Sequence, residues 1–102
     1  MLELRPTCEN CNTELPPAST QAMICTYECT FCKRCVDTVL ENVCPNCGGG
    51  FCQRPVRPSA NLKNDLCLAT HPASQIVVHN PLNPAAHARF AKKIKSVPAH
   101  KR

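Results

Sequence analysis

The residues best suited to chemistry are eight cysteines that lie between positions 8 and 47. They form four near-pairs, which are Cys8/Cys11, Cys25/Cys29, Cys32/Cys35 and Cys44/Cys47. Two or three residues between the members of a pair allow one tight turn to direct both thiolates at a single ion. Because Zn²⁺ prefers four such ligands in a tetrahedron, the spacing predicts two zinc sites of four cysteines each.

A disulfide framework is the alternative use of so many cysteines. Small disulfide-rich proteins are typically secreted, and secreted chains begin with an apolar leader. The first seven residues carry Glu3 and Arg5 and no apolar run, so we expect no leader. No stretch approaches the ~18 apolar residues that a membrane span needs. We therefore expect a cytoplasmic protein without a membrane segment, whose thiols stay reduced and free to bind metal.

The spacing alone leaves two ways to distribute the four pairs between two ions. In a sequential arrangement, the first two pairs bind one ion and the last two pairs bind the other. In an interleaved arrangement, the first pair joins the third and the second joins the fourth. Both arrangements give each ion four sulfur ligands, so ligand number does not choose between them.

The segment from the third cysteine to the eighth resembles a RING finger. It has the spacing of that family, an aromatic residue, Phe31, before the fifth ligand, and a Cys-Pro-x-Cys ending at Cys47. Cys29 stands where the commonest RING pattern has a histidine. The resemblance implies an interleaved, cross-brace fold of the treble-clef kind. By that resemblance, the first zinc is bound by Cys8, Cys11, Cys32 and Cys35, and the second by Cys25, Cys29, Cys44 and Cys47.

The same resemblance raises the hypothesis of a ubiquitin ligase. RING ligases bind a conjugating enzyme through a surface that this chain changes at three positions. Asn10 replaces an apolar residue, Val39 replaces a larger side chain, and Gly48 replaces a basic residue. Because a shared fold does not carry a shared activity, we expect the chain not to be an enzyme.

A second resemblance extends over nearly the whole chain. Its segments are Met1–Pro6, Leu15–Pro17, Met23–Cys25, Glu28–Cys32, Cys44–Phe51 and Arg54–Pro55. They are similar to a family of short bacterial cysteine-rich proteins that is known as domain of unknown function 1272. This resemblance implies no particular activity.

The elements that must position the cysteines are short. Residues 22–25 and 29–32 are expected to form a β-hairpin. Residues 33–42 are expected to form a helix, because four apolar residues recur on one face with helical spacing. Pro45 then prevents the helix from continuing. We therefore expect a small α+β fold, dominated by metal, with one hairpin and one helix.

The chain divides into two parts of opposite charge. Residues 1–52, the expected zinc module, hold three Lys or Arg against six acidic residues, a formal charge of −3. Residues 53–102 hold nine Lys or Arg against Asp65 alone, a charge of +8. Because opposite charges attract, we expect this basic, proline-containing tail to dock on the module. Within the tail, residues 75–79 are expected to form a strand and residues 84–96 a helix, which Asn83 can cap.

No catalytic arrangement accompanies the cysteines. Four thiolates leave a zinc ion no open position for water and make it a weak Lewis acid, so the ions are expected to be structural. The four histidines all lie in the tail without ligand spacing: His71, His79, His87 and His100. Two further cysteines, Cys52 and Cys67, are expected to be free thiols.

Two functions other than catalysis remain in competition. The first is a rigid, zinc-stabilised module that binds another protein. The second is nucleic-acid binding through cations of the tail, namely Arg54, Arg57, Lys63, Arg89, Lys92, Lys93 and Lys95. With one Tyr, three Phe and no Trp, the chain has few side chains on which bases could stack, so protein binding is favoured. Metal storage or sensing would instead require labile ions.

Overall fold

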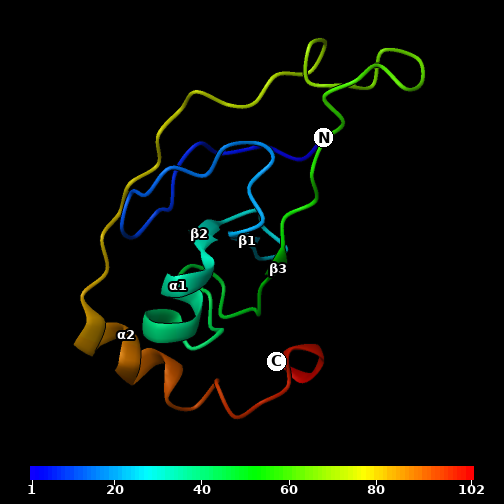
Figure 1. Cartoon of the computed structure of the whole chain (residues 1–102). Coiled ribbons are helices and arrows are strands. Elements are labelled where there is room, and N and C mark those ends of the chain that lie inside the picture. Colours follow the sequence, from blue (N-terminus) through cyan, green and yellow to red (C-terminus); the bar gives the residue numbers. More distant parts are fainter.

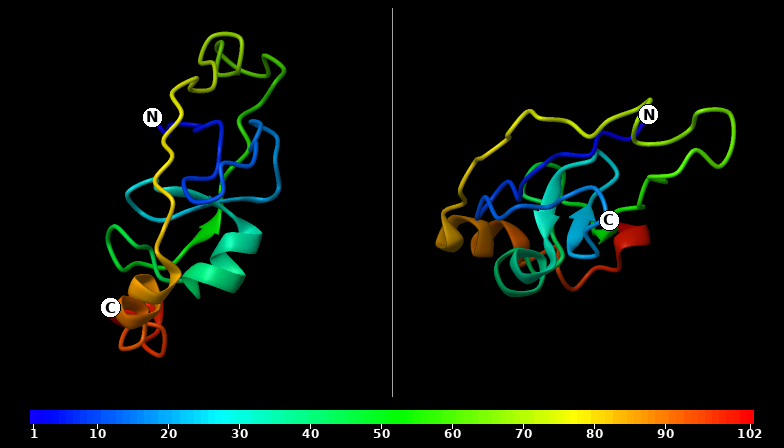
Figure 2. Two further views of the ribbon diagram at one scale, coloured as in Figure 1. Left: turned by 90° about the vertical axis from the view of Figure 1, so that its left-hand side faces the viewer. Right: turned by 45° about the horizontal axis from the view of Figure 1, so that its top comes forward.

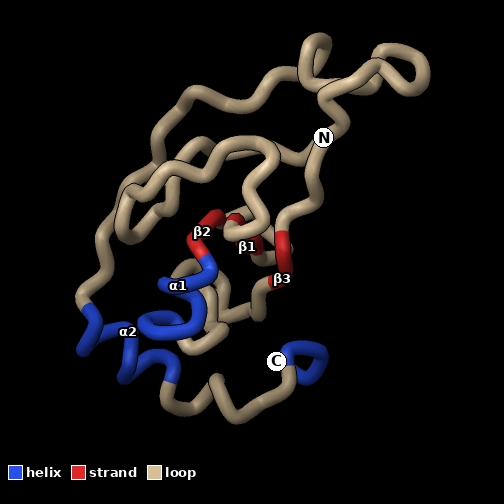
Figure 3. Tube along the Cα trace, viewed as in Figure 1, coloured by secondary structure: helices blue, strands red, loops and turns tan.

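The computed structural model describes all residues from 1 to 102 and has a small three-stranded antiparallel sheet near its centre (Figure 1). Strands β1 (Ala22–Ile24), β2 (Thr30–Cys32) and β3 (Cys52–Gln53) are arranged in the order β2-β1-β3. Helices lie beside the sheet, and much of the remaining chain is loop (Figure 3). The predicted small α+β fold is confirmed.

The predicted hairpin is formed by β1 and β2, with Met23 opposite Phe31. Cys25 and Cys29 lie just beyond the paired residues, at the two ends of the connecting turn. Glu28 adopts a left-handed backbone conformation, with φ of 65°, which reverses the chain there. The hairpin therefore brings the second cysteine pair together at its tip.

Strand β3 was not predicted. Its pairing places Cys52 opposite Ile24, and the following amide, of Arg54, donates to the carbonyl of Ala22 at 2.8 Å. The expected boundary between residues 52 and 53 thus falls inside this strand. A strand of two residues has no periodicity that the sequence could display, because its existence depends on the distant edge of β1.

The predicted helix over residues 33–42 is shorter in the structure. It begins as α1 (Lys33–Cys35) and continues as one wider, π-helical turn, η1 (Val36–Leu40). Glu41 and Asn42 then adopt left-handed conformations, with φ of 51° and 58°. These two residues end the helix before Pro45 is reached.

The tail forms one α-helix, α2 (Pro84–Ala91), which ends before residue 96, the predicted limit. Asn83 caps its first turn through its side-chain oxygen, as the sequence suggested. Past the helix, the Ile94 amide bonds the carbonyl three residues back at 2.9 Å, so the chain continues in tighter turns. The short 3₁₀ helix η2 (Ala99–Lys101) follows.

The strand predicted at residues 75–79 is absent. This segment runs along the outside of the molecule without a neighbouring strand (Figure 2). Its flanks are held by two bonds: the Ser74 amide donates to Leu4 at 3.0 Å, and the Asn80 amide donates to Glu9 at 2.8 Å. Its β-branched residues favour an extended backbone, but a strand also needs a partner, and this chain supplies none.

The buried core is built largely of cysteine. Its main cluster has 11 residues, six of which are cysteines. The aromatic contribution is one pair: Phe31 meets Phe51 edge to face, with ring centroids 5.5 Å apart. Because apolar side chains contribute so little to this core, most of the stabilisation of this region has to come from the interactions that hold the cysteine sulfur atoms together.

The structure contains no helix with both the length and the apolar composition of a membrane span.

Candidate metal centres

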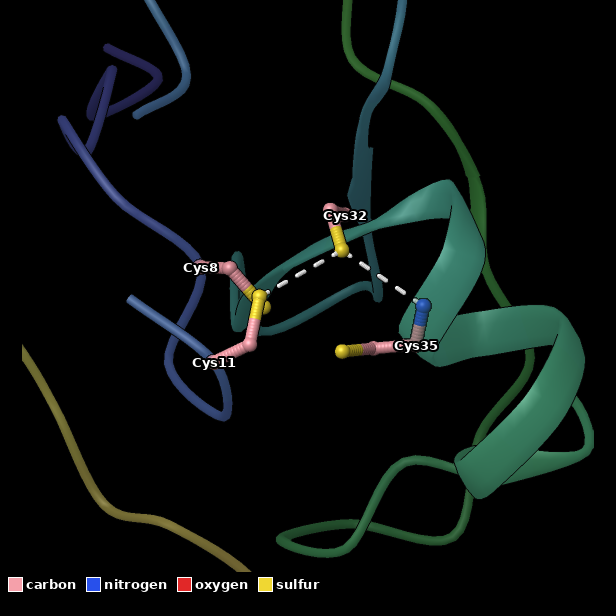
Figure 4. A group of neighbouring side chains, drawn as sticks. All are labelled: Cys8, Cys11, Cys32 and Cys35. Carbon is pink, nitrogen blue, oxygen red and sulfur yellow. Dashed lines mark hydrogen bonds between the residues drawn. The ribbon is translucent and has the colours of Figure 1, made fainter. Parts of the chain in front are cut away.

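The first cysteine cluster, called site 1 here, joins the first and third pairs (Figure 4). Cys8 and Cys11 come from a turn near the N-terminus, Cys32 ends β2, and Cys35 lies in α1. Their four Sγ atoms all lie within 4.8 Å of one another. The Cys11 and Cys32 Sγ atoms are 3.7 Å apart. Sulfurs bound ~2.3 Å from one zinc ion in a tetrahedron would be ~3.8 Å apart, so the spacing fits.

Local backbone structure explains how site 1 forms. In the first turn, the Asn12 amide donates to the Cys8 carbonyl at 2.9 Å, which closes the loop that carries the first pair. At the junction of β2 and α1, Cys32 is the N-cap of the helix, and its sulfur accepts a hydrogen bond from the Cys35 amide at 3.5 Å. Because the strand runs directly into the helix, Cys32 and Cys35 lie on one short bend.

The second cluster, called site 2, brings together Cys25, Cys44 and Cys47, whose sulfurs also lie within 4.8 Å of one another. Cys29, the fourth ligand that the RING resemblance implies, falls outside this mutually close set. It still belongs to the same neighbourhood, because Asn46, between Cys44 and Cys47, donates to its sulfur at 3.4 Å. The eight cysteines are thus distributed in the interleaved order, and none of them forms a disulfide.

The turn of site 2 depends on a glycine. The Gly48 amide donates to the Cys44 carbonyl at 2.8 Å, and Gly48 itself has φ of 77°. A side chain at this left-handed position would be strained. The next amide, of Gly49, donates to the Cys47 sulfur at 3.4 Å. The glycine run therefore both reverses the chain and supplies an N–H group to a sulfur.

The two sites share one hydrogen-bonding pattern. Each contains a Cys-x-Asn-Cys turn, and its asparagine reaches across to the other cysteine pair of the same site. Asn10 donates to the Cys35 sulfur and Asn46 to the Cys29 sulfur, both at 3.4 Å. Hydrogen-bond donors directed at sulfur stabilise the thiolate relative to the thiol, and the thiolate is the form that binds metal.

The pKa values of the site 1 thiols are shifted in both directions. Burial raises the pKa of Cys8 and raises the pKa of Cys35 to about 12. Burial acts in the same direction on Cys11, but hydrogen bonds, led by the Thr13 amide, outweigh it and lower its pKa to about 7. Four thiolates this close repel one another, and a divalent ion removes that penalty.

A buried carboxylate fastens the first turn of site 1 to the sheet. Glu9 lies between Cys8 and Cys11, and its side chain accepts hydrogen bonds from the Thr30 amide in β2 and from Arg5 at 2.8 Å. Its own amide donates to the Thr30 carbonyl at 3.0 Å. Glu9 was not predicted as a site residue, although it lies between the two members of the first cysteine pair.

Arg54 is buried, and the structure corrects its expected role. It is only 1 % exposed, so it lies out of reach of a phosphate at the surface. Its guanidinium donates to the carbonyls of Arg5, Leu15 and Pro16 at 2.9 to 3.2 Å, and it has no acidic partner. Burial lowers its pKa. Arg54 thus ties β3 to the loops around the first cysteine turn.

Two more of the seven tail cations are also engaged within the chain. Arg57 donates to the carbonyls of Leu2 and His71 at 2.7 and 2.8 Å. Lys95 pairs with Glu41 of the module at 3.2 Å. Four form no ion pair: Lys63, Arg89, Lys92 and Lys93.

The tail contacts the module at site 1 and at the helix. The Asn10 side-chain oxygen accepts the Leu82 amide at 3.0 Å, and its carbonyl lies 3.1 Å from the ring of His79. His87 on α2 bonds the Leu40 carbonyl of η1 at 3.0 Å. Two of the four histidines thus serve docking. The two remaining cysteines, Cys52 and Cys67, belong to neither cluster.

Comparison with known proteins places the chain in a family. The model of the family described as protein of unknown function (DUF1272) matches residues 1–57, more than half of the chain. An uncharacterised protein of Rhizobium meliloti (strain 1021) is 53% identical over 81 residues, which cover 79% of this chain and 89% of that protein. No solved structure matches the chain.

Proposed function

The chain belongs to the DUF1272 family, and from the geometry of its sulfur atoms we propose that it is a protein with two structural zinc ions. In this proposal it binds another protein, catalyses no reaction and resides in the reducing cytoplasm, where thiols stay free for metal. The observation that carries the proposal is site 1, where four sulfurs lie within 4.8 Å of one another.

The donor sets favour zinc and a structural role. Tetrahedral sites made of sulfur alone suit zinc or iron, and sulfur ligands disfavour Mg²⁺ and Ca²⁺. Cys8, Cys11, Cys32 and Cys35 would hold the first ion, and Cys25, Cys29, Cys44 and Cys47 the second. With all four positions filled by protein, a bound ion would supply cross-linking between loops.

Elemental analysis of the purified protein tests the metal assignment. We expect two zinc ions per chain and a colourless solution. A weak chelator should leave at least one ion in place, because structural sites resist exchange. Iron with visible absorbance, fewer than one ion per chain, or complete loss of zinc to the weak chelator would each contradict the proposal.

Contacts of the tail argue against ligase activity. At the position where RING ligases present an apolar residue to the conjugating enzyme, Asn10 bonds Leu82 and His79 of its own tail. Helix α2 also packs against η1, which contains Val39. A conjugating enzyme would therefore have to displace the tail. Autoubiquitination assays with a panel of conjugating enzymes should give no product.

An apolar groove beside β3 supports protein binding. Two adjoining hollows, of about 520 and 380 Å³, share Leu2, Ile24 and Cys52 as lining residues. Met1 and Val56 extend the apolar surface and are themselves exposed. Because apolar surface of this kind is costly to leave in water, we assign it to apolar side chains of a partner protein.

A matched pair of variants tests the groove. Val56 and Leu62 are both exposed apolar residues, but only Val56 lines a hollow. Cross-linking in native lysate should capture the same partner with the unmodified chain and with Leu62→Asp, and should lose it with Val56→Asp. Capture that is insensitive to Val56→Asp, or absent altogether, would contradict binding at this surface.

A further inference from the structure

An uncharged stretch interrupts the basic tail. Between Asp65 and Arg89 there is no lysine, arginine, aspartate or glutamate. Its centre, residues 75–79, has the composition of a β-strand and lies between Pro72 and Pro81. Exposed edge strands are commonly protected from pairing by charges, especially lysine. Residues 75–79 carry no such protection.

The backbone of residues 75–79 is almost free of partners. The Ser74 and Asn80 amides anchor its two flanks to the N-terminal segment. Between these anchors, the Ile76 amide bonds the Ser74 hydroxyl at 3.1 Å, and no carbonyl of the segment accepts a hydrogen bond from the chain. The segment is therefore held in place while most of its hydrogen-bonding groups face outward or remain unpaired.

Most side chains of the segment are also exposed. Ile76 and Val77 are 69% and 55% exposed, although β-branched residues usually lie in sheets and in cores. Free backbone groups and exposed β-branched side chains together form the surface to which another strand adds. The strand predicted from the sequence has the right composition and lacks only a neighbour.

We propose that residues 75–79 pair antiparallel with the same residues of a second copy of this chain, around a two-fold axis at Val77. In an extended segment, backbone groups of alternate residues face the same edge. Since the Ser74 and Asn80 amides face the N-terminal segment, the odd-numbered residues between them face the free edge. The central residue of that edge is Val77.

The register that follows is self-complementary. With Val77 opposite the partner's Val77, Gln75 lies opposite the partner's His79. Three pairs of odd-numbered residues then exchange two hydrogen bonds each, or about six in total. Ile76 meets the partner's Val78, so β-branched side chains pack across the ribbon. Every residue of the segment thus has a suitable counterpart.

The self-complementary register favours a second copy as the occupant of this edge, and charge fixes where two copies can meet. The tail as a whole carries +8, so two identical tails repel each other along most of their length. The stretch around Val77 is where two copies approach without like charges. A two-fold contact also places the same patch on both subunits, as homodimers commonly do. The pairing requires neither the proposed partner protein nor the groove beside β3.

Sedimentation equilibrium on the metal-loaded, full-length protein tests the proposal. So short a ribbon buries less than the ~1,200 Å² of a standard interface. We therefore expect a weak dimer, with a dissociation constant between about 10 μM and 1 mM. Val77→Pro removes the central donor and should weaken dimerisation at least ~10-fold. Val78→Pro is the control. The Val78 amide faces away from the partner, so removal of its N–H group should leave dimerisation unchanged. Two zinc ions per chain would verify that both variants fold.

Amide hydrogen exchange of the unmodified protein gives a second measurement. Raising the protein concentration should slow exchange at Gln75, Val77 and His79 and leave Val78 unaffected. A protein that stays monomeric at the highest concentration would overturn the proposal. So would equal effects of the two proline variants, or protection that appears elsewhere in the chain.

Discussion

Site 1 and site 2 are built from the same kind of turn and differ in how closely their sulfur atoms converge. At site 1, all four sulfurs are mutually close, and Cys11 is its one exposed cysteine. Asn10 of its turn also holds the tail through Leu82. At site 2, only three sulfurs meet the same limit, and Cys47 is its one exposed cysteine. Identical local chemistry thus gives one centre where four sulfurs converge and one where three do.

The difference assigns separate tasks to the two sites. Site 1 joins the N-terminal turn, β2, α1 and the tail, so its ion would hold together segments that are far apart in the sequence. Site 2 joins the hairpin tip to the turn after η1, where the Arg102 guanidinium donates to the Gly48 carbonyl at 3.1 Å. Each prediction below compares one site with the other.

Removing a ligand from site 1 should have the largest effect. Structural zinc binding contributes ~10–16 kcal/mol, whereas a whole domain is stable by ~5–15 kcal/mol. Cys32→Ser should therefore unfold the module and reduce bound zinc to one ion or less. Cys47→Ser, at the exposed edge of site 2, should lose one ion and keep the tail docked. Zinc content and circular dichroism measure both results, and equal damage from the two variants would contradict the comparison.

Chelation should remove the two ions in sequence. A chelator displaces an ion more easily where fewer ligands converge on it, and only three sulfurs are mutually close at site 2, so its ion should leave first and the ion of site 1 second. Release followed with a chromogenic indicator should show two phases of equal amplitude. Cys47→Ser provides the control, since it should abolish the fast phase alone. A single phase in the unmodified protein would mean that the convergence of the sulfur atoms does not distinguish the sites.

Replacing Arg54 should be the next largest change. Arg54→Met leaves three carbonyls near the first cysteine turn without their donors, and each buried acceptor left unpaired costs ~1–3 kcal/mol. Arg57→Met removes two hydrogen bonds, which are more exposed than those of Arg54. It should lower the free energy of unfolding by ~1–3 kcal/mol. Urea unfolding measures both. If Arg57→Met proved the more destabilising variant, the assignment of Arg54 as the central tie would be wrong.

The asparagine pair offers the finest comparison. Asn10→Ala and Asn46→Ala each remove a donor to sulfur, and each hydrogen bond contributes ~0.5–1.5 kcal/mol. Only Asn10 also bonds the tail, so only its replacement should speed amide exchange at Leu82. Exchange at Leu82 that is unchanged in Asn10→Ala, or raised as much in Asn46→Ala, would show that the tail docks independently of site 1.

Sequence reasoning succeeded where structure is local. The β-hairpin, the start of the helix at Lys33 and the Asn83 cap were all predicted, because each depends on neighbouring residues. The helix ends were wrong at Asn42 and at residue 96. Left-handed backbone at Asn42 and tightened turns after α2 ended the two helices earlier than apolar periodicity indicated.

Long-range contacts were beyond that reasoning. Strand β3 exists because of an edge on β1, and Arg54 is buried because three carbonyls from distant loops surround it. In the sequence, Arg54 looks like any other cation of a basic tail. Residues 75–79 show the opposite case, since their composition favours a strand but no neighbour is present in the chain.

The sequence by itself determined the chemistry of this protein: four cysteine pairs, turned by their spacing toward soft metal ions, in a chain with too few large apolar residues to pack a core. Only the tertiary structure decided which loops meet at each cluster, which cations are buried and where the tail docks. The reason is physical. Turn and ligand geometry act over a few residues, whereas burial and long-range hydrogen bonds exist only once the chain has folded.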